Sequence, residues 1–398
     1  LNDFFKEIYP HPHNYEASFI VSDLINQVSS SVKPFVVEIL TELPEPAKSF
    51  AAKNGFSPNG NEAYITVKDI RAYDHYTARR LAEDRLDNLS DLFTLFFHKK
   101  QISWRGDVVI TQCCNNEPVL VRTPKGAMEK GFDLKPDRAA KELNTFLKKF
   151  SARGISFQKF NRVVDLHGIC LSSDIAENQL VNIWTSLETI VPSHAGSSKI
   201  GGIISAISPF IAICYLQRIV ERFTADLILW DKWRAKKILK KVPCSNPNIL
   251  QERTLNLLSI DSNKAILDEL YAALKDFHLL RFRAFNLSEL FNDPKKLQGL
   301  IETHQKKVAW QLRRIYRTRN LIVHSGRTLF YINTLIENGH DYLDQVLFDI
   351  MRMSCNEYRV KTLEQAFEIV KVRFQKFNNT LSAIDKFDDN NTKFILEA

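Results

Sequence analysis

The stretch Tyr316–Gly326 reads YRTRNLIVHSG and places an arginine and a histidine five positions apart near the end of a predicted helix. Because an α-helix takes about 3.6 residues per turn, Arg319 and His324 differ by about 140° around the helix axis. They can meet at one ligand only if the helix ends or bends near His324, or if a second chain completes the site. Gly326 is suited to end the helix, since glycine commonly provides the left-handed residue just past a helix end.

The side-chain chemistry of this pair suits a phosphodiester. Arginine presents a planar fork of donors that matches phosphate oxygens. Histidine titrates near neutral pH and can move protons at a 2′-hydroxyl or at a leaving 5′-oxygen. The same spacing also fits a surface arginine and a histidine that favours the helix C-terminus. The motif by itself therefore leaves both interpretations open.

Two segments of the chain resemble a known family. The run Arg319–His324, preceded by Leu312–Arg317, is similar to the Arg-x4-His signature of the HEPN superfamily. In detail it resembles the ApeA-like HEPN group of bacterial antiphage proteins, in which Arg-Asn is followed by an aliphatic pair, then His and a small residue. The run Leu180–Ile190 resembles the first HEPN helix of that group, with its Trp-x2-Leu-Glu core. The resemblance covers about residues 165–385 and says little about the first 160.

The resemblance implies both a fold and an activity. HEPN domains are antiparallel helical bundles that usually dimerise and bring two motifs together in one cleft. The implied activity is metal-independent cleavage of RNA, with tRNA as one candidate substrate, in antiphage abortive-infection defence. Arg319 would bind and polarise the scissile phosphate, and His324 would act as general acid or base in attack by the 2′-hydroxyl. Asn320 would position one of these groups, and Glu188 would orient Arg319.

The composition is that of an ordinary globular protein with a mild basic excess. Of the 398 residues, 44% are hydrophobic and 25% are charged, and this length favours about two or three domains. The formal net charge of +8 favours an anionic partner such as RNA. The six cysteines form no CxxC pair and no Cys/His spacing typical of zinc, which indicates a reducing cytoplasm. We expect no metal and no cofactor.

Residues 1–160 are predicted to form an α+β region with a sensor or regulatory role, or with a structural one. The predicted elements are a strand, a helix and two strands of a hairpin, at residues 63–70, 76–98, 108–111 and 118–122. Asp74 is expected near the N-cap of the helix. The apolar segment 17–43 fits either strands or a helix.

Residues 161–398 are predicted to form an all-α HEPN-type antiparallel bundle. Counting the helix that precedes this region, the amphipathic segments are 139–150, 175–191, 203–241, 264–278, 279–291, 294 to the motif, 328–354 and 363–384. The apolar start of 203–241 is too short for a membrane span and contains Pro209. We therefore expect a buried core helix and no membrane association.

Two groups of cations are candidate RNA contacts. Arg313, Arg314 and Arg317 precede the motif on the same predicted helix. Lys236 and Lys237 belong to a basic segment that also contains tryptophans, a composition that suits phosphate attraction and base stacking. Cations that favour a helix C-terminus on a solvated face would explain these lysines equally well.

The leading functional hypothesis is a homodimeric HEPN endoribonuclease that a phage-derived trigger activates. The alternative is a non-catalytic HEPN scaffold that dimerises and binds RNA or a protein partner. Dependence on Arg319 and His324 separates the two hypotheses, because a scaffold keeps its RNA affinity and its biological effect without His324.

Overall fold

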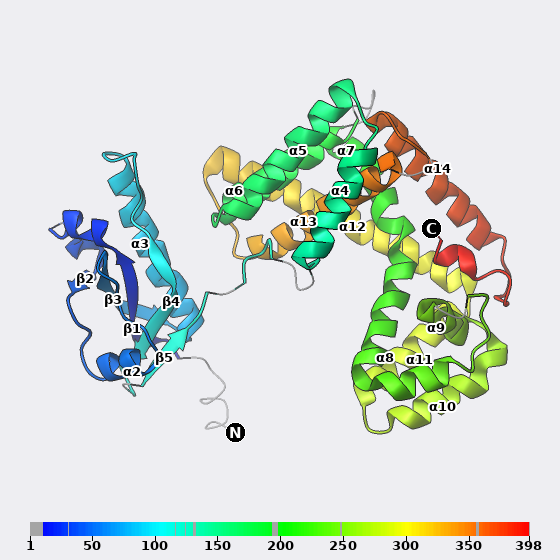
Figure 1. Ribbon diagram of the computed structural model, residues 1–398, viewed down its shortest axis with the longest axis horizontal. Coiled ribbons are helices and arrows are strands. Elements are labelled where there is room, and N and C mark those ends of the chain that lie inside the picture. The colour runs from blue at the N-terminus through cyan, green and yellow to red at the C-terminus, as the bar shows by residue number, and fades with distance from the viewer. Residues whose placement is uncertain are drawn as a thin grey trace. The chain divides into compact units, whose positions relative to one another are not determined.

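The structure of this chain, a computed structural model, describes residues 11–30, 32–115, 117–123, 125–129, 133–192, 198–246, 249–355 and 358–397. The chain divides into two compact units, Leu1–Lys125 and Gly126–Ala398. The first unit contains a sheet with helices, and the second is helical (Figure 1). The predicted order, an α+β region followed by a helical region, is confirmed.

The first unit is built on a five-stranded antiparallel sheet with strand order β2-β3-β1-β4-β5. Its strands are β1 (His13–Ser22), β2 (Val37–Leu40), β3 (Glu62–Ala72), β4 (Trp104–Gln112) and β5 (Pro118–Val121). The predicted strand at 63–70 is β3, and the predicted hairpin is β4 and β5, with Val109 opposite Leu120. The apolar segment 17–43 forms strands and short 3-10 turns, rather than a helix.

Both faces of the sheet are covered because apolar residues follow one another along its central strands. Phe19 of β1 packs with the apolar residues of α3 (His75–Thr94), while the next residue, Ile20, packs on the other face with α2 (Ala47–Lys53). Successive strand side chains point to opposite faces, so one strand serves two cores. Asp74 is the N-cap of α3, as predicted, and accepts a hydrogen bond of 2.8 Å from Thr77 N.

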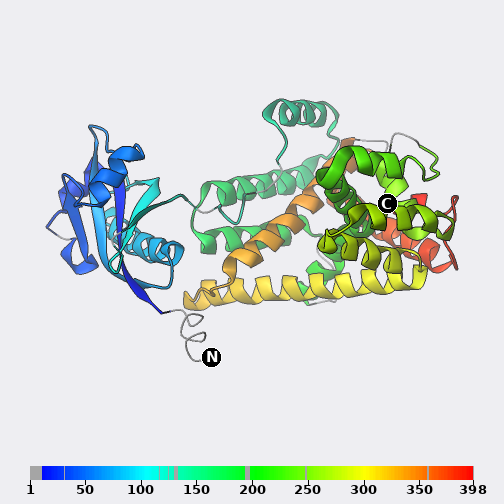
Figure 2. The same ribbon diagram turned by 90° about the horizontal axis from the view of Figure 1, so that it is seen from below.

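The second unit consists of helices arranged around two hydrophobic cores. They are α4 (Pro136–Lys149), α5 (Gly154–Ser172), α6 (Ala176–Ile190), α7 (Lys199–Ile213), α8 (Tyr215–Leu239), α9 (Leu250–Ser259), α10 (Lys264–Leu274), α11 (His278–Phe291), α12 (Pro294–Ser325), α13 (Ile332–Cys355) and α14 (Leu363–Ser382). Figure 2 shows α12 running along one side of this unit, with α13 crossing it obliquely. Leu297 and Ile301 of α12 belong to one core, and Leu312 and Ile315 belong to the other, so α12 joins the two.

Helix α4 belongs to the second unit, and the boundary between the units therefore lies at residue 125 rather than at the expected residue 160. Phe146 of α4 packs against the core that contains α5, and its ring lies 6.1 Å from that of Phe160. Cys355 Sγ, at the end of α13, also donates to Phe146 O over 3.8 Å. The contact with Cys355 joins residues that are 209 positions apart, so local patterns do not predict it.

Three helical predictions need correction, and the first concerns α5 (Gly154–Ser172), which was not predicted as a helix. The segment 203–241 is not one helix, because α7 and α8 are bent by 40° at a break around Cys214. Within the described residues, no single helix is long and apolar enough to cross a membrane, although α7 and α8 together meet the length and composition criteria. The third correction is α9, which was not predicted. It is buried along Thr254–Ser259, where the polar residues Thr254, Asn256 and Ser259 stand between the leucines.

Candidate functional site

The Arg-x4-His motif lies in the last two turns of α12, and both ends of this helix are capped. Asp293 accepts hydrogen bonds from Lys295 N and Lys296 N at 2.9 and 3.4 Å. Gly326 takes the left-handed conformation (φ 60°, ψ 17°), and its N–H donates to Ile322 O at 3.0 Å. The helix thus ends at Ser325, one residue after the histidine, and Gly326 caps it as the sequence predicts.

The inner face of α12 is held against α6. Leu312, Ile315 and Thr318 are buried on this face. On α6, the fully buried Trp184 places its ring 5.1 Å from the ring of Tyr316. These contacts fix the rotation of α12, and the rotation determines which motif residues face outward.

One stripe of α12 carries most of the predicted polar residues. Arg313, Arg317, Asn320 and His324 follow one another at intervals of three or four residues, so they share one face of the helix. The two arginines and His324 are exposed, and Asn320 is half-buried. Arg319 starts about 140° away from His324 around the axis. Its Nη1 donates to Asn320 Oδ1 at 3.0 Å, so Asn320 links the guanidinium to the stripe.

The guanidinium of Arg319 retains a buried donor. Its Nε is shielded from solvent and has no acceptor among the residues that the structure describes. Leaving a buried donor unpaired costs about 1–3 kcal/mol. His324 is exposed and has no hydrogen-bond partner within the described ranges. One motif residue is thus fixed by packing, while the other is open to solvent.

Glu188 lies on α6 and has different partners from those expected. Its Oε1 accepts a hydrogen bond of 2.6 Å from Trp184 Nε1 and pairs with Lys199 Nζ at 3.0 Å. Across the described parts of the chain, no hydrogen bond or ion pair joins Glu188 to Arg319. The reason is local, because Trp184 precedes Glu188 by four residues and lies on the same helix face. In the single chain, Asn320 takes the expected position of Glu188 beside Arg319.

The turn that follows the motif is anchored by two contacts. The guanidinium of Arg314 lies over the ring of Tyr331, 4.8 Å from its centroid. Thr328 Oγ1 donates to Glu177 Oε1 at the beginning of α6. The turn is therefore tied both to α12 and to α6, and Arg314 is engaged within the fold.

The structure does not bring Lys236 and Lys237 to the motif. They lie near the end of α8, where the neighbouring Ala235 and Ile238 pack in the core formed with α9, α10 and α11. The motif end of α12 packs in the other core, with α6 and α13 (Figure 1). Trp233, beside these lysines, is 82% exposed. This basic segment is therefore a separate surface.

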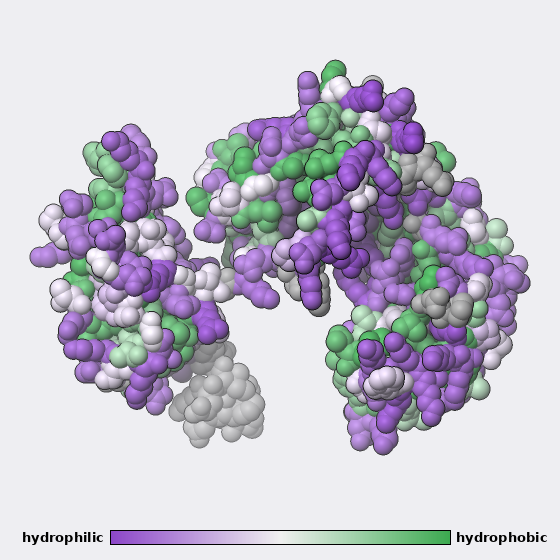
Figure 3. Space-filling view, viewed as in Figure 1, coloured by the Kyte–Doolittle hydropathy of each residue, from purple (hydrophilic) through white to green (hydrophobic). Residues whose placement is uncertain are grey.

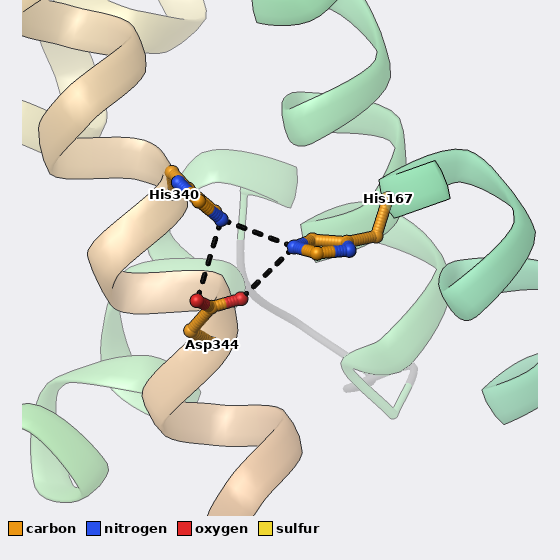
Figure 4. A group of neighbouring side chains, drawn as sticks. All are labelled: His167, His340 and Asp344. Atoms are coloured by element: carbon orange, nitrogen blue, oxygen red, sulfur yellow. Dashed lines mark hydrogen bonds and ion pairs between the residues drawn. The ribbon is translucent and has the colours of Figure 1, made fainter. Parts of the chain in front are cut away.

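A second polar cluster was not predicted from the sequence. His167 of α5 faces His340 and Asp344 of α13, and all three side chains point toward one another (Figure 4). The two Nε2 atoms are 3.0 Å apart, and Asp344 oxygens lie 3.1 Å from His167 Nε2 and 3.3 Å from His340 Nε2. The spacing of His340 and Asp344 by one helical turn was the available signal. His167 is 173 residues away from His340, and only the fold brings it there.

Comparison of the chain with protein-family models, with curated proteins and with solved structures finds no match.

Proposed function

We propose that this chain is an endoribonuclease of the HEPN type, which cleaves RNA without a metal ion at a site formed by two copies of the chain. The observation that carries the proposal is the end of α12. There the guanidinium of Arg319 is held by Asn320, while His324 is exposed on the same stripe as Asn320. An anchored anion-binding group and a solvent-accessible imidazole at the same helix end supply two of the groups that this reaction uses.

Each residue of the site has a distinct role in the proposed reaction. Arg319 binds the scissile phosphate and stabilises the charge that develops on its oxygens. His324 takes the proton of the 2′-hydroxyl or gives a proton to the leaving 5′-oxygen. Asn320 positions Arg319 through the 3.0 Å hydrogen bond. Glu188 acts through Trp184, whose ring packs against Tyr316 of α12. The products are a cyclic phosphate and a 5′-hydroxyl, so DNA, which lacks the 2′-hydroxyl, is not cleaved by this route.

A second copy of the chain supplies the other half of the site. Exposed apolar side chains lie in the motif and in the turn after it, since Val323 is 50% and Phe330 93% exposed. Helix α5 adds further exposed apolar residues, namely Ile155, Phe157, Val164, Ile169 and Leu171. In Figure 3, hydrophobic residues gather over α5 and α6. Exposed apolar patches of this kind mark interaction surfaces, and a homodimer here brings two His324 side chains together.

Arg313 and Arg317 give the site its affinity for RNA. They occupy the same stripe as His324, about two and about three turns before it, and both are exposed. A phosphate backbone that lies along this stripe meets two cations before it reaches the motif. Lys236 and Lys237 supply a more distant contact beside the exposed Trp233. Arg314 contributes less, because its guanidinium already lies over Tyr331.

We place this activity in the bacterial cytoplasm, as a response to phage infection. The six cysteines, without paired spacing, suit a reducing compartment. Uncontrolled RNA cleavage is toxic, so the α+β unit acts as the regulatory part that responds to a phage-derived trigger. The toxicity of the full chain, compared with and without phage infection, tests this regulation. Equal toxicity in both conditions contradicts it.

The test of the proposed reaction is cleavage of total RNA and of tRNA by purified protein in EDTA. His324→Ala is expected to lower the cleavage rate by about 10²–10⁴-fold, the usual contribution of a positioned acid or base. Arg319→Ala is expected to lower it by about 10²–10³-fold, as loss of a donor that stabilises transition-state charge does. His278→Ala and Arg281→Ala are matched controls. These substitutions remove one histidine and one arginine that are exposed on α11, away from the motif. Controls that lose activity as strongly as the motif variants would contradict the proposal.

The scaffold alternative predicts a different outcome in the same experiment. Under this alternative, the folded dimer binds RNA with equal affinity with and without His324. It also leaves RNA intact after exposure to a phage lysate. The exposed Trp233 beside Lys236 and Lys237 is the feature that favours such a role. RNA binding that depends on Lys236 and Lys237, but not on Arg313 and Arg317, would identify it.

A further inference from the structure

We propose that His167, His340 and Asp344 form a binding site for a divalent transition-metal ion, with zinc as the preferred ion. This site goes beyond the proposed RNA cleavage and does not depend on it. The three residues come from two helices, α5 and α13, and their ligand atoms all lie within 4.8 Å of one another (Figure 4). The proposal rests on the separations of these atoms, on their chemical types and on their surroundings.

The separations match those of ligands that share one ion. Zinc binds histidine nitrogen and carboxylate oxygen at about 2.0–2.2 Å. Two such ligands are about 3.0 Å apart when they subtend 90° at the ion, and about 3.4 Å apart when they subtend a tetrahedral angle. The two Nε2 atoms are 3.0 Å apart, and each faces a different oxygen of Asp344, with His167 Nε2 3.1 Å from Oδ1 and His340 Nε2 3.3 Å from Oδ2. An ion can therefore contact all three groups without a large movement of either helix.

Hydrogen bonds among the three side chains explain this arrangement less well than a bound metal ion does. Both histidines direct the same ring nitrogen, Nε2, toward the other ring and toward Asp344. If both neutral rings carry their proton on Nε2, each ring can donate to a different oxygen of Asp344, but the two Nε2 atoms then face each other at 3.0 Å with no acceptor between them. A cation at the centre satisfies all three approaches, since neutral imidazole and carboxylate are both metal ligands.

The donor atoms identify the class of metal. Two imidazole nitrogens and one carboxylate oxygen suit zinc and the neighbouring divalent ions iron, cobalt and nickel. Magnesium and calcium prefer sites made of oxygen ligands only. Three protein ligands leave at least one coordination position for water, as in catalytic zinc sites. His167 is 23% exposed on its side chain, so this position is open to solvent, while His340 is buried.

The ion would also join α5 to the helix that supports the motif. Gly339, next to His340, lies so close to α6 and α12 that a Cβ atom there would be 2.9 Å from Ile183 Cγ2 and 3.4 Å from Ile315 Cδ1. This close approach fixes α13 against α12. Metal ligation at the next residue then fixes α5 to the same assembly. The ion thus stabilises the arrangement of the bundle around the motif.

The test is zinc binding by the full chain, stripped of metal with a chelator and dialysed. Titration with zinc sulfate, followed by elemental analysis of the desalted protein, is expected to give one ion per chain. Cobalt is the spectroscopic probe, because its visible absorption reports nitrogen and oxygen ligation directly. His167→Gln and Asp344→Asn are expected to weaken zinc binding by about tenfold or more, as loss of groups around a metal does.

His278→Gln is the matched control, since His278 is an exposed histidine outside the cluster. It is expected to bind zinc like the unaltered chain. Partly exposed His167 is the preferred position for substitution, because its replacement leaves the buried His340 in place. A folded, unaltered chain that retains no zinc overturns the proposal. Zinc binding that persists undiminished in both cluster variants also overturns it, because the ion then binds elsewhere.

Discussion

His304 makes the stability of the helical unit sensitive to acid. It lies on α12, and its ring stacks on that of Tyr215 with centroids 3.6 Å apart and an interplanar angle of 2°. Its Nε2 is buried and has no partner among the described residues. Burial, together with the nearby charges of Arg218 and Lys307, lowers the pKa of His304 from 6.5 to about 4. The fold therefore holds this imidazole in its neutral form.

The direction and size of the effect follow from the difference in pKa between the two states. Above pH 6.5 the imidazole is neutral in both the folded and the unfolded chain, so it adds no pH dependence. As the pH falls from 6.5 to 4, the unfolded chain binds a proton that the folded chain does not, and the free energy of unfolding decreases. The loss attributed to His304 is about 2 kcal/mol at pH 5 and about 3 kcal/mol below pH 4.

Urea denaturation of the full chain, followed by far-UV circular dichroism, measures this effect at pH 7 and at pH 5. His304→Phe is the matched variant, because phenylalanine keeps a ring stacked on Tyr215 and cannot take up a proton. The unaltered chain is expected to lose about 2 kcal/mol more than the variant between the two pH values. Equal losses in the two proteins would refute the reasoning, because the histidine would then be accommodated equally well in its charged form.

Three further predictions concern the motif and the metal cluster. Gly326→Ala is expected to lower the free energy of unfolding by about 1–2 kcal/mol, because alanine is strained at φ 60°, whereas Gly326→Asn costs less; chemical denaturation of both variants measures the difference. Trp184→Phe removes the hydrogen bond to the Glu188 carboxylate and is expected to cost about 1.5–3 kcal/mol in the same assay. Zinc at about 100 times its dissociation constant is expected to stabilise the chain by about 2.7 kcal/mol; thermal denaturation detects the rise, which Asp344→Asn should abolish.

Much of the fold could be predicted because its signals are local. The cap residues Asp74 and Asp293, and the glycine at 326, each mark a helix end through their own backbone chemistry. The strands of the hairpin at 108–121 have their own β-rich composition. The helix predictions that were wrong concern features that depend on tertiary packing. The bend at Cys214 interrupts an apolar run that reads as continuous, and α9 places polar residues such as Asn256 in the core.

The candidate site could be predicted only in part. Arg319 and His324 are close in sequence, so their helix and its end were accessible to pattern reasoning. The partner of Arg319 was not, because the choice between Asn320 and Glu188 depends on how Trp184 packs. The cluster at His167 lay outside such reasoning altogether. Its residues come from two helices that are far apart in the sequence, so no short motif contains all three. Only His340 and Asp344, which are one helical turn apart, form a recognisable pair.

The chemical nature of the cleaved ends tests the central claim most directly. Total RNA and tRNA are incubated with the metal-stripped protein and with its His324→Ala variant, and the fragment ends are identified by mass spectrometry. The unaltered protein is expected to produce 2′,3′-cyclic phosphate and 5′-hydroxyl ends, and the His324→Ala variant is expected to produce none. Ends with a 5′-phosphate and a 3′-hydroxyl, or fragments that form equally well without His324, would contradict the claim.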